Sequence, residues 1–317
     1  MPYKYNEIHC HKFKKSRYKV TNWHEYNNAL RRRGDFTIYF TDEAIAGWRP
    51  AKTGGRGRPL EYSEVAIETG LLLRQVFHLP LRQTEGLMIS LARVMEADIA
   101  IPYFSSISKR SVELPKHILT KAMEPGSIVI VDSTGLKVYG KDEWYQEKHS
   151  VPARRTWRKL HLAIDENHQV LARELTTPEV GDPTAVPNLL DQIATPFDTF
   201  IADGAYDGEP VSQAVLDKQP DAQVVIPPHT TAVCSVACDT QRDQHIQTIE
   251  QQGRIAWQRI TGYNLRSHVE LAMQRYKRIF GKAMKARALP QQKTEAWSSS
   301  SALNIMTNLG MPVSVKI

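Results

Sequence analysis

The sequence predicts a mixed α/β fold in which helices flank a sheet, preceded by a helical region and a basic N-terminal arm. Three observations support this class. Residues 128–131 form an unbroken run of β-branched side chains, which is typical of a strand buried on both faces. Three strand patterns then occur in succession, and beyond them helix and strand patterns alternate. This order indicates an antiparallel meander that continues into parallel crossovers.

The composition fits an ordinary globular protein. The chain has 317 residues, of which 41% are hydrophobic and 24% charged, which excludes a disordered chain, a collagen-like fibre and a disulfide-stapled mini-protein. We find neither a run of roughly 20 apolar residues that would span a membrane nor an apolar signal-peptide core near residue 1. Three cysteines with no framework spacing point to a reducing compartment. We therefore expect a soluble, cytoplasmic protein.

The positive charge is concentrated at the N-terminus. Residues 1–34 carry nine Lys or Arg against two Glu, an excess that equals the net charge of +7 of the whole chain. Residues 54–59 follow with Arg56 and Arg58 between glycines and a proline, a slim extended segment that suits a narrow minor groove. We assign 1–59 to a DNA-binding arm and linker; a solvated tail and a flexible linker are the alternatives.

Three short helices are predicted between residues 60 and 122. Ser63 is a suitable N-cap for the first, which should end near residue 78. The second covers 81–95, and the third begins at a hydroxyl-rich segment after residue 102 and ends with basic residues. This order is typical of a helix-turn-helix DNA reader, and equally of a three-helix packing unit with no DNA. The candidate DNA contacts here are Lys109 and Arg110.

The α/β part is assigned to residues 123–317. Its first strand should end at Asp132, where a carboxylate interrupts the apolar run. The remaining elements are expected as strands at 156–165 and 169–176, a helix at 182–193, a strand at 200–202, a helix at 210–216 and a strand at 223–226. Residues 227–262 are interpreted as a modest insertion that could shield the site.

Two strands end in an aspartate followed by a small residue. These are Asp132 before Ser133 and Asp203 before Gly204. A carboxylate at the end of a buried strand is costly unless a cation or a hydrogen-bond donor satisfies it. If the strands are neighbours, both oxygens meet at one sheet edge and suit Mg²⁺ or Mn²⁺. Each dipeptide is also common in turns, so a purely structural role stays open.

A helix predicted over residues 263–280 adds a third acid. At about 100° per residue, Tyr263, Arg266, Glu270 and Lys277 fall within roughly 60° of one another. The apolar residues gather on a neighbouring face, so one stripe packs while the other presents an acid, two cations and a phenol. The alternative is a solvated face with an Arg266–Glu270 pair.

The spacing Tyr263-x2-Arg266-x3-Glu270-x6-Lys277 resembles the Y-x2-R-x3-E-x6-K signature of bacterial insertion-sequence transposases with a DDE triad. The resemblance covers almost the whole chain and is strongest to the insertion-sequence-five group. Further similar segments are residues 79–86, 157–165, 203–207, 267–281 and 302–312.

The resemblance implies a ribonuclease H-like fold with Asp132, Asp203 and Glu270 as catalytic triad and metal ligands. Asp132 would bridge two Mg²⁺ ions, for which Mn²⁺ can substitute, and the other two acids would hold one ion each. It also implies that Tyr263, Arg266 and Lys277 contact DNA. The implied partners are double-stranded DNA, as terminal inverted repeats and target, and further copies of the chain in a homodimer or higher assembly. The implied location is the bacterial nucleoid.

Two further groups of residues come from charge and spacing alone. We expect four cations around Trp157 to contact the DNA backbone; they are Arg154, Arg155, Arg158 and Lys159. Residues 229–239 depart from the family pattern. Cys234 and Cys238 could be drawn as a zinc site with His229 and His245, although the spacing is unorthodox.

The predicted activity is therefore a transposase that recognises the ends of its element, cleaves them and joins the 3′-hydroxyl to target DNA. One alternative is a ribonuclease H-like nuclease that cuts without joining. The other is a catalytically idle DNA-binding regulator, which would be expected to have a broken triad.

Overall fold

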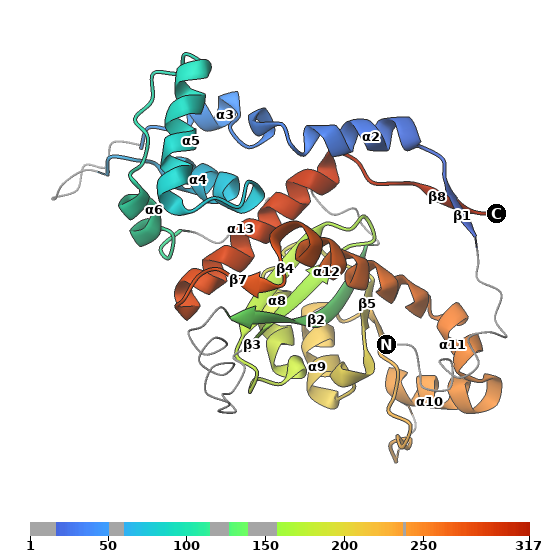
Figure 1. Ribbon diagram of the computed structural model, residues 1–317. Helices are drawn as coiled ribbons and strands as arrows, with labels where there is room; N and C mark the ends of the chain where they lie inside the picture. Colours follow the sequence, from blue (N-terminus) through green and yellow to red (C-terminus); the bar gives the residue numbers. More distant parts are fainter. Residues whose placement is uncertain (1–16, 51–59, 115–126, 139–156, 237–238) are drawn as a thin grey trace, which may run out of the picture.

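The computed structural model describes residues 17–50, 60–114, 127–138, 157–236 and 239–317. Its centre is a sheet with helices on both faces, and a group of N-terminal helices lies beyond one of them (Figure 1). The expected mixed α/β fold is confirmed. The predicted strands and helices are present, and further ones occur that the sequence did not predict, such as the strand Ala283–Met284 and the helix Leu289–Asn308.

The central sheet has the strand order β4-β3-β2-β5-β6, and β7 pairs with the far end of β2. Strands β2, β3 and β4 are antiparallel neighbours, whereas β5, β6 and β7 continue the sheet by parallel pairing. A meander followed by parallel crossovers is the strand order that the sequence patterns predicted. The strands are β2 Ile128–Val138, β3 Trp157–Ile164, β4 Val170–Thr176, β5 Thr199–Ala202, β6 Gln223–Val225 and β7 Ala283–Met284.

The expectation that the first strand ends at Asp132 is wrong. β2 continues to Val138, because β3 remains its antiparallel partner as far as the pair Lys137–Trp157. On its other side, β5 ends at Ala202, opposite Val131. Asp132 therefore lies inside a long strand, at the point where its parallel neighbour stops.

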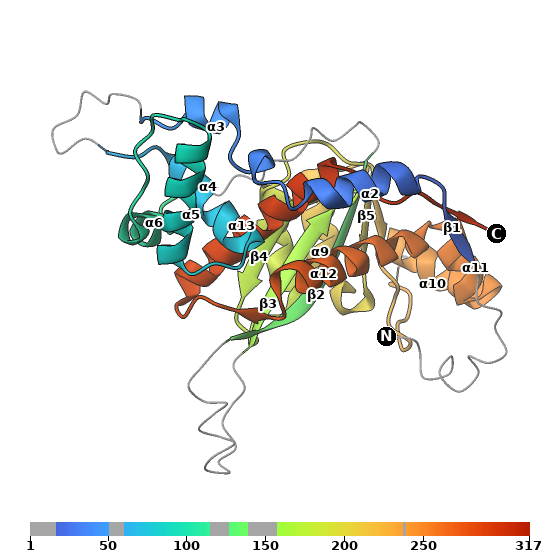
Figure 2. The same ribbon diagram turned by 45° about the horizontal axis from the view of Figure 1, so that its top comes forward.

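Each face of the sheet has its own helices. One face packs against α8 (Val186–Asp191) and α9 (Glu209–Lys218). The other packs against α12 (Ser267–Phe280) and α13 (Leu289–Asn308). α13 is buried along most of its length, including its run of four serines, so it forms the middle of the molecule (Figures 1 and 2).

The predicted insertion contains two helices, α10 (Gln241–Gln252) and α11 (Arg254–Ile260). A buried hydrogen-bond chain anchors them. Trp257 Nε1 donates to His245 Nδ1 at 3.0 Å, and His245 Nε2 is 2.8 Å from the carbonyl oxygen of Val224 in β6.

The N-terminal helices share a core with α13. Ser63 Oγ accepts a hydrogen bond from the Ala66 amide, so the predicted N-cap is confirmed. Trp297 and Met306 of α13 belong to the same apolar cluster as these helices. The predicted division of the chain near residue 123 stays a prediction. The helices are α2 Trp23–Arg32, α3 Asp42–Ala46, α4 Glu64–Val76, α5 Leu81–Val94 and α6 Phe104–Arg110.

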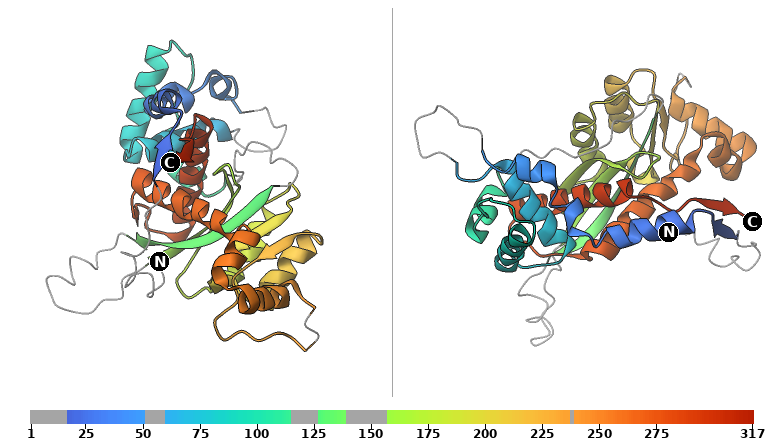
Figure 3. Two further views of the ribbon diagram at one scale, coloured as in Figure 1. Left: turned by 90° about the vertical axis from the view of Figure 1, so that its right-hand side faces the viewer. Right: turned by 90° about the horizontal axis from the view of Figure 1, so that it is seen from above.

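Segments from the two ends of the described chain lie side by side. β1 (Tyr18–Val20) pairs antiparallel with β8 (Ser314–Lys316) in a separate two-stranded sheet, at the side of the molecule away from α4 and α5 (Figure 3). Among the described helices, none is long and apolar enough to cross a membrane.

Candidate active site

Asp132 and Asp203 lie beside each other on the face of the sheet that α12 covers. The last paired residues of β2 and β5 are Val131 and Ala202, so the two aspartates occupy the next position on each strand. Strand alternation puts them on the face of Ile130 and Ile201, which pack in the α12 and α13 core. Asp132 Oδ1 accepts a hydrogen bond from the Ser133 amide at 2.7 Å.

Asp203 ends β5 and begins a short 3₁₀ helix at Gly204–Tyr206. Its Oδ1 accepts the Ala205 amide at 2.9 Å, so it caps this turn. The structural role that the sequence left open is therefore present, and the same carboxylate also faces Asp132, whose pKa it raises.

The predicted helix from residue 263 begins differently from the expectation. Gly262, with φ of +69°, turns the chain into a 3₁₀ turn at Tyr263–Arg266, and α12 starts only at Ser267. The turn brings the predicted side chains together. Arg266 donates from Nε to the Tyr263 hydroxyl at 3.2 Å, and from Nη1 and Nη2 to Glu270 Oε1 at 2.6 and 2.7 Å.

Arg266 also links this turn to the sheet. Its Nη2 lies 3.8 Å from Asp132 Oδ2, so one guanidinium faces acids from both β2 and α12. Lys277, further along α12, donates to Thr134 Oγ1 at 2.6 Å. Thr134 is two residues beyond Asp132 on the same face of β2, so Lys277 contacts the strand that carries Asp132.

The electrostatics of the site reflect its burial. The pKa of Asp132 is raised to about 6, first by burial and also by the charges of Asp203 and Glu270, whereas the Ser133 amide and Arg266 lower it. Burial also raises the pKa of Tyr263 to about 12. The pKa of Lys277 is lowered by burial and by the neighbouring charge of Lys282. An ionised Asp132 is thus only partly compensated by the groups around it.

Carboxylate oxygens are hard ligands, so the chemistry of these acids fits a divalent cation such as Mg²⁺. Asp132 and Asp203 supply two such groups at adjacent positions. Glu270 is held by Arg266, and within the described residues no three His, Cys, Asp or Glu side chains form a cluster that could hold a metal ion. Completion of a three-acid site therefore requires Glu270 to turn from Arg266 toward the aspartates.

Comparison with known proteins identifies the family. Two family models, each described as a transposase DDE domain, match residues 31–141 and 124–305. The second match alone covers more than half of the chain. The chain belongs to the DDE transposase family. Among solved structures, a piggyBac transposase synaptic complex with hairpin DNA is similar at 11% identity and a TM-score of 0.34, over 92% of this chain and 77% of that chain.

The predicted DNA contacts of this transposase on β3 do not form one surface. Arg158 donates to Gln292 Oε1 at 2.9 Å on the α13 side. Lys159 points to the other face and pairs with Asp182 at 2.9 Å. Alternation along a strand separates the two neighbours, and both side chains already have partners within the protein. Arg154 and Arg155 lie outside the described residues, as do Arg56 and Arg58.

The remaining predicted residues are distant from the acids or differently engaged. Lys109 is exposed on α6, whereas the Arg110 guanidinium donates to the carbonyl of Tyr62. His245 uses both ring nitrogens in the hydrogen bonds that anchor α11, which leaves it no nitrogen for zinc in this arrangement. Cys238 lies outside the described residues.

Sequence reasoning missed two polar partners in the transposase site. Thr134 accepts from Lys277, and Asp182 accepts from Ser133 Oγ at 3.0 Å on the opposite face of β2. Asp182 precedes a proline at the start of a helical segment, which is a local signal for a helix start but not for contact with a strand 49 residues earlier.

Proposed function

We propose that this transposase binds the terminal repeats of its element, cleaves the strand ends by metal-dependent hydrolysis and joins the freed 3′-hydroxyl to target DNA. In this proposal Asp132, Asp203 and Glu270 are the catalytic acids. The observation that carries it is the adjacency of Asp132 and Asp203 on the sheet face that α12 covers, with Arg266 in contact with both Asp132 and Glu270. The finer assignment to the insertion-sequence-five group rests on the Tyr263-to-Lys277 spacing.

The three acids would hold two divalent cations, Mg²⁺ or Mn²⁺, with Asp132 shared between them. When bound, these ions lower the pKa of the attacking oxygen and stabilise the charge on the leaving oxygen of an in-line displacement. The acids need no proton of their own for this role and would act in their ionised form, which a bound cation favours.

Arg266, in the turn before α12, and Lys277, in α12, would position the DNA strand. Arg266 is released from Glu270 when that acid turns to the metal site, and its fork of donors is then available to a phosphate near the scissile bond. Tyr263 holds the guanidinium from the other side, and Lys277 contacts the flanking strand. Both chemical steps break one P–O bond and form another at phosphorus, first with water and then with the 3′-hydroxyl as attacker.

End recognition is assigned to the N-terminal arm and the helices α4 to α6, with exposed Lys109 as a backbone contact. A homodimer or higher assembly would pair the two ends of the element. The end-recognition assignment is supported by the excess of basic residues in 1–34 and by the helix order.

A strand-transfer assay tests the proposal, with labelled duplex ends taken from the DNA that flanks the gene, supercoiled target and Mg²⁺ or Mn²⁺. Glu270→Gln should abolish cleavage and joining but leave DNA binding intact. Glu250→Gln is the matched control, since Glu250 is exposed on α10. Metal-dependent cutting without joined product in the unmodified protein would favour the nuclease. Binding without cutting would favour the idle regulator, and loss of binding in Glu270→Gln would count against its role as a metal ligand.

A further inference from the structure

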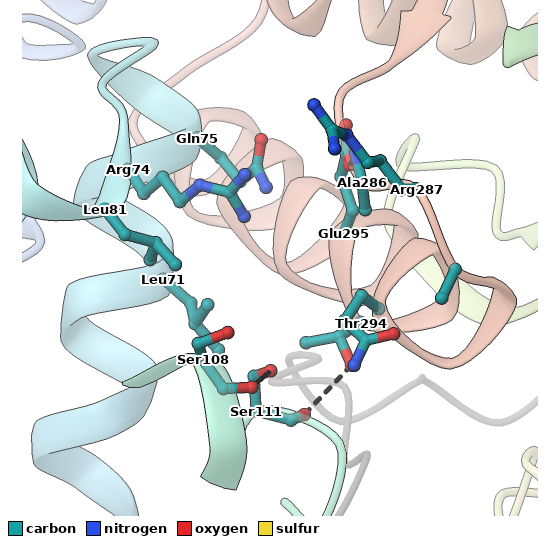
Figure 4. Close-up of a pocket in the computed structure, with 12 residues that line it drawn as sticks. Leu71, Arg74, Gln75, Leu81, Ser108, Ser111, Ala286, Arg287, Thr294 and Glu295 are labelled. Atoms are coloured by element: carbon teal, nitrogen blue, oxygen red, sulfur yellow. Dashed lines mark hydrogen bonds between the residues drawn. The ribbon is translucent and has the colours of Figure 1, made fainter. Parts of the chain in front are cut away.

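A cavity with several polar side chains in its lining lies where the N-terminal helices meet the start of α13. It has a volume of about 440 Å³. It is lined by the C-terminal half of α4, the start of α5, the end of α6, the segment that joins β7 to α13, and the first two turns of α13. Figure 4 shows side chains from both walls directed into it. We call it the seam pocket, after the boundary between the N-terminal helices and the α/β part.

The α4 wall of the seam pocket carries donors without acceptors. Gln75 is only 2% exposed, and its Nε2 has no hydrogen-bond partner among the described residues. The Nε of Arg74, next to it, is likewise buried without a partner in the part of the chain that the structure describes. Buried donors of this kind are costly unless a ligand or water satisfies them. Both side chains line the cavity, so an acceptor placed there would satisfy them together.

The opposite wall adds charge and a second amide. Arg287 is exposed and lines the cavity from the β7–α13 segment. Gln291 lies beside it with Oε1 unpaired within the described residues, and rotation of its amide would present the NH₂ group instead. The acid of the pocket, Glu295, accepts the backbone amides of Lys285 and Ala286, at 2.9 and 2.7 Å.

The charge balance around the seam pocket is positive. Arg74, Arg287 and Lys285 gather around the one carboxylate of Glu295. The pKa of Lys285 is lowered by burial and by the charge of Arg74, although Glu295 opposes the shift. Cations that crowd one another in this way favour the arrival of an anion.

We propose that the seam pocket binds a phosphate of the DNA backbone, outside the acid site. The inference rests on the proposed function, because it is DNA that would reach both sites. DNA is favoured over a free phosphate as the ligand, because further cations lie between the acid site and the seam pocket. β7 pairs with β2 at Lys137, five residues beyond Asp132, and Lys277 and Lys282 lie in α12 and just after it. From Asp132 to Lys137 is roughly 17 Å along β2, and a duplex held at the acids and at the pocket would pass this segment.

The test is the salt dependence of duplex binding by the full chain. The logarithm of the affinity falls linearly with the logarithm of the salt concentration. Each lost phosphate contact should make this negative slope less steep by about one and weaken binding at low salt. We expect this for Arg287→Ala and for Arg74→Ala. The matched control is Lys218→Ala, which removes one positive charge from α9 on the opposite face of the sheet and should leave the slope unchanged. Arg287 is exposed, so its variant keeps the assay valid if Arg74→Ala fails to fold.

The outcomes separate this proposal from the proposed function. Unchanged slopes in both variants, with DNA cleavage intact in the unmodified protein, would overturn the seam pocket alone. A second experiment titrates the protein with inorganic phosphate. If phosphate binds saturably, and Arg287→Ala removes this binding without changing the salt dependence of DNA binding, the pocket binds a free anion. That result would overturn the DNA contact. No DNA binding by the unmodified protein would refute the proposed function itself.

Discussion

Replacing Asp132 by asparagine should stabilise the folded protein at neutral pH while removing its proposed chemistry. The pKa of the carboxyl is about 6 in the folded protein against an ordinary 3.8. Because the folded state holds the proton more tightly, the stability that depends on this group falls as the pH rises from about 4 to about 6. At 1.36 kcal/mol per pKa unit, the full cost above this range is about 3 kcal/mol. Asparagine does not ionise, and its Oδ1 can still accept the Ser133 amide.

The assay is urea unfolding of both proteins at pH 4 and pH 7.5 in the presence of a chelator. The quantity compared is the free energy of unfolding of Asp132→Asn minus that of the unmodified protein. This difference should be about 3 kcal/mol larger at pH 7.5 than at pH 4. Groups that titrate equally in both proteins, such as Asp165, cancel in this difference. Asp98→Asn is the control, because Asp98 forms an exposed pair with Arg49 at 3.7 Å, and it should show no such difference.

A variant whose advantage is the same at both pH values would refute the argument, because it would mean that burial of the charge has no cost. If the stability of the variant relative to the unmodified protein fell as the pH rises, Arg266 and the Ser133 amide would outweigh the cost of burial. Either result would also remove the electrostatic reason for expecting a cation beside Asp132.

Two further predictions concern the elements around the site. Ser63→Ala removes the acceptor for the Ala66 amide at the start of α4 and should lower the free energy of unfolding in urea by about 1 kcal/mol; an unchanged midpoint would mean that the cap contributes nothing. Trp257→Phe leaves His245 Nδ1 without its donor and should cost about 1–3 kcal/mol, measured by the same method. Trp23→Phe is the control, because Trp23 is exposed, and it should leave stability unchanged. Equal losses in Trp257→Phe and Trp23→Phe would contradict the hydrogen-bond argument.

Local signals predicted most of the fold. The β-branched run of 128–131 and the serine cap at residue 63 act within a few residues, so the sequence alone suffices to place the strand and the helix. The extension of β2 could not be predicted in the same way. Asp132 to Gly135 resembles a turn, and only the distant partner β3 keeps it extended, with Trp157 packed 3.2 Å from where a side chain on Gly135 would begin.

The candidate site was predictable to the extent that spacing determines it. The interval from Arg266 to Glu270 allowed their ion pair, which was the alternative interpretation of this face. The small residue after Asp203 marked the end of β5, whereas β2 continues past Asp132. The contact of Lys277 with Thr134 was not predictable, since it depends on how α12 crosses the sheet. The strand alternation of Arg158 and Lys159 was visible in the sequence and already argued against a shared surface.

The shared core of α4 and α13 has a consequence for the order in which the protein forms. α13 is the last helix of the chain, and its Trp297 and Met306 complete the apolar cluster of the N-terminal helices. During synthesis, α4 emerges from the ribosome more than 200 residues before this partner, an interval that takes on the order of 10–40 s. A nascent or truncated chain that stops before α13 would expose the apolar face of α4. The N-terminal helices are thus made early but packed late, and a polypeptide cut short would lack the finished core of these helices.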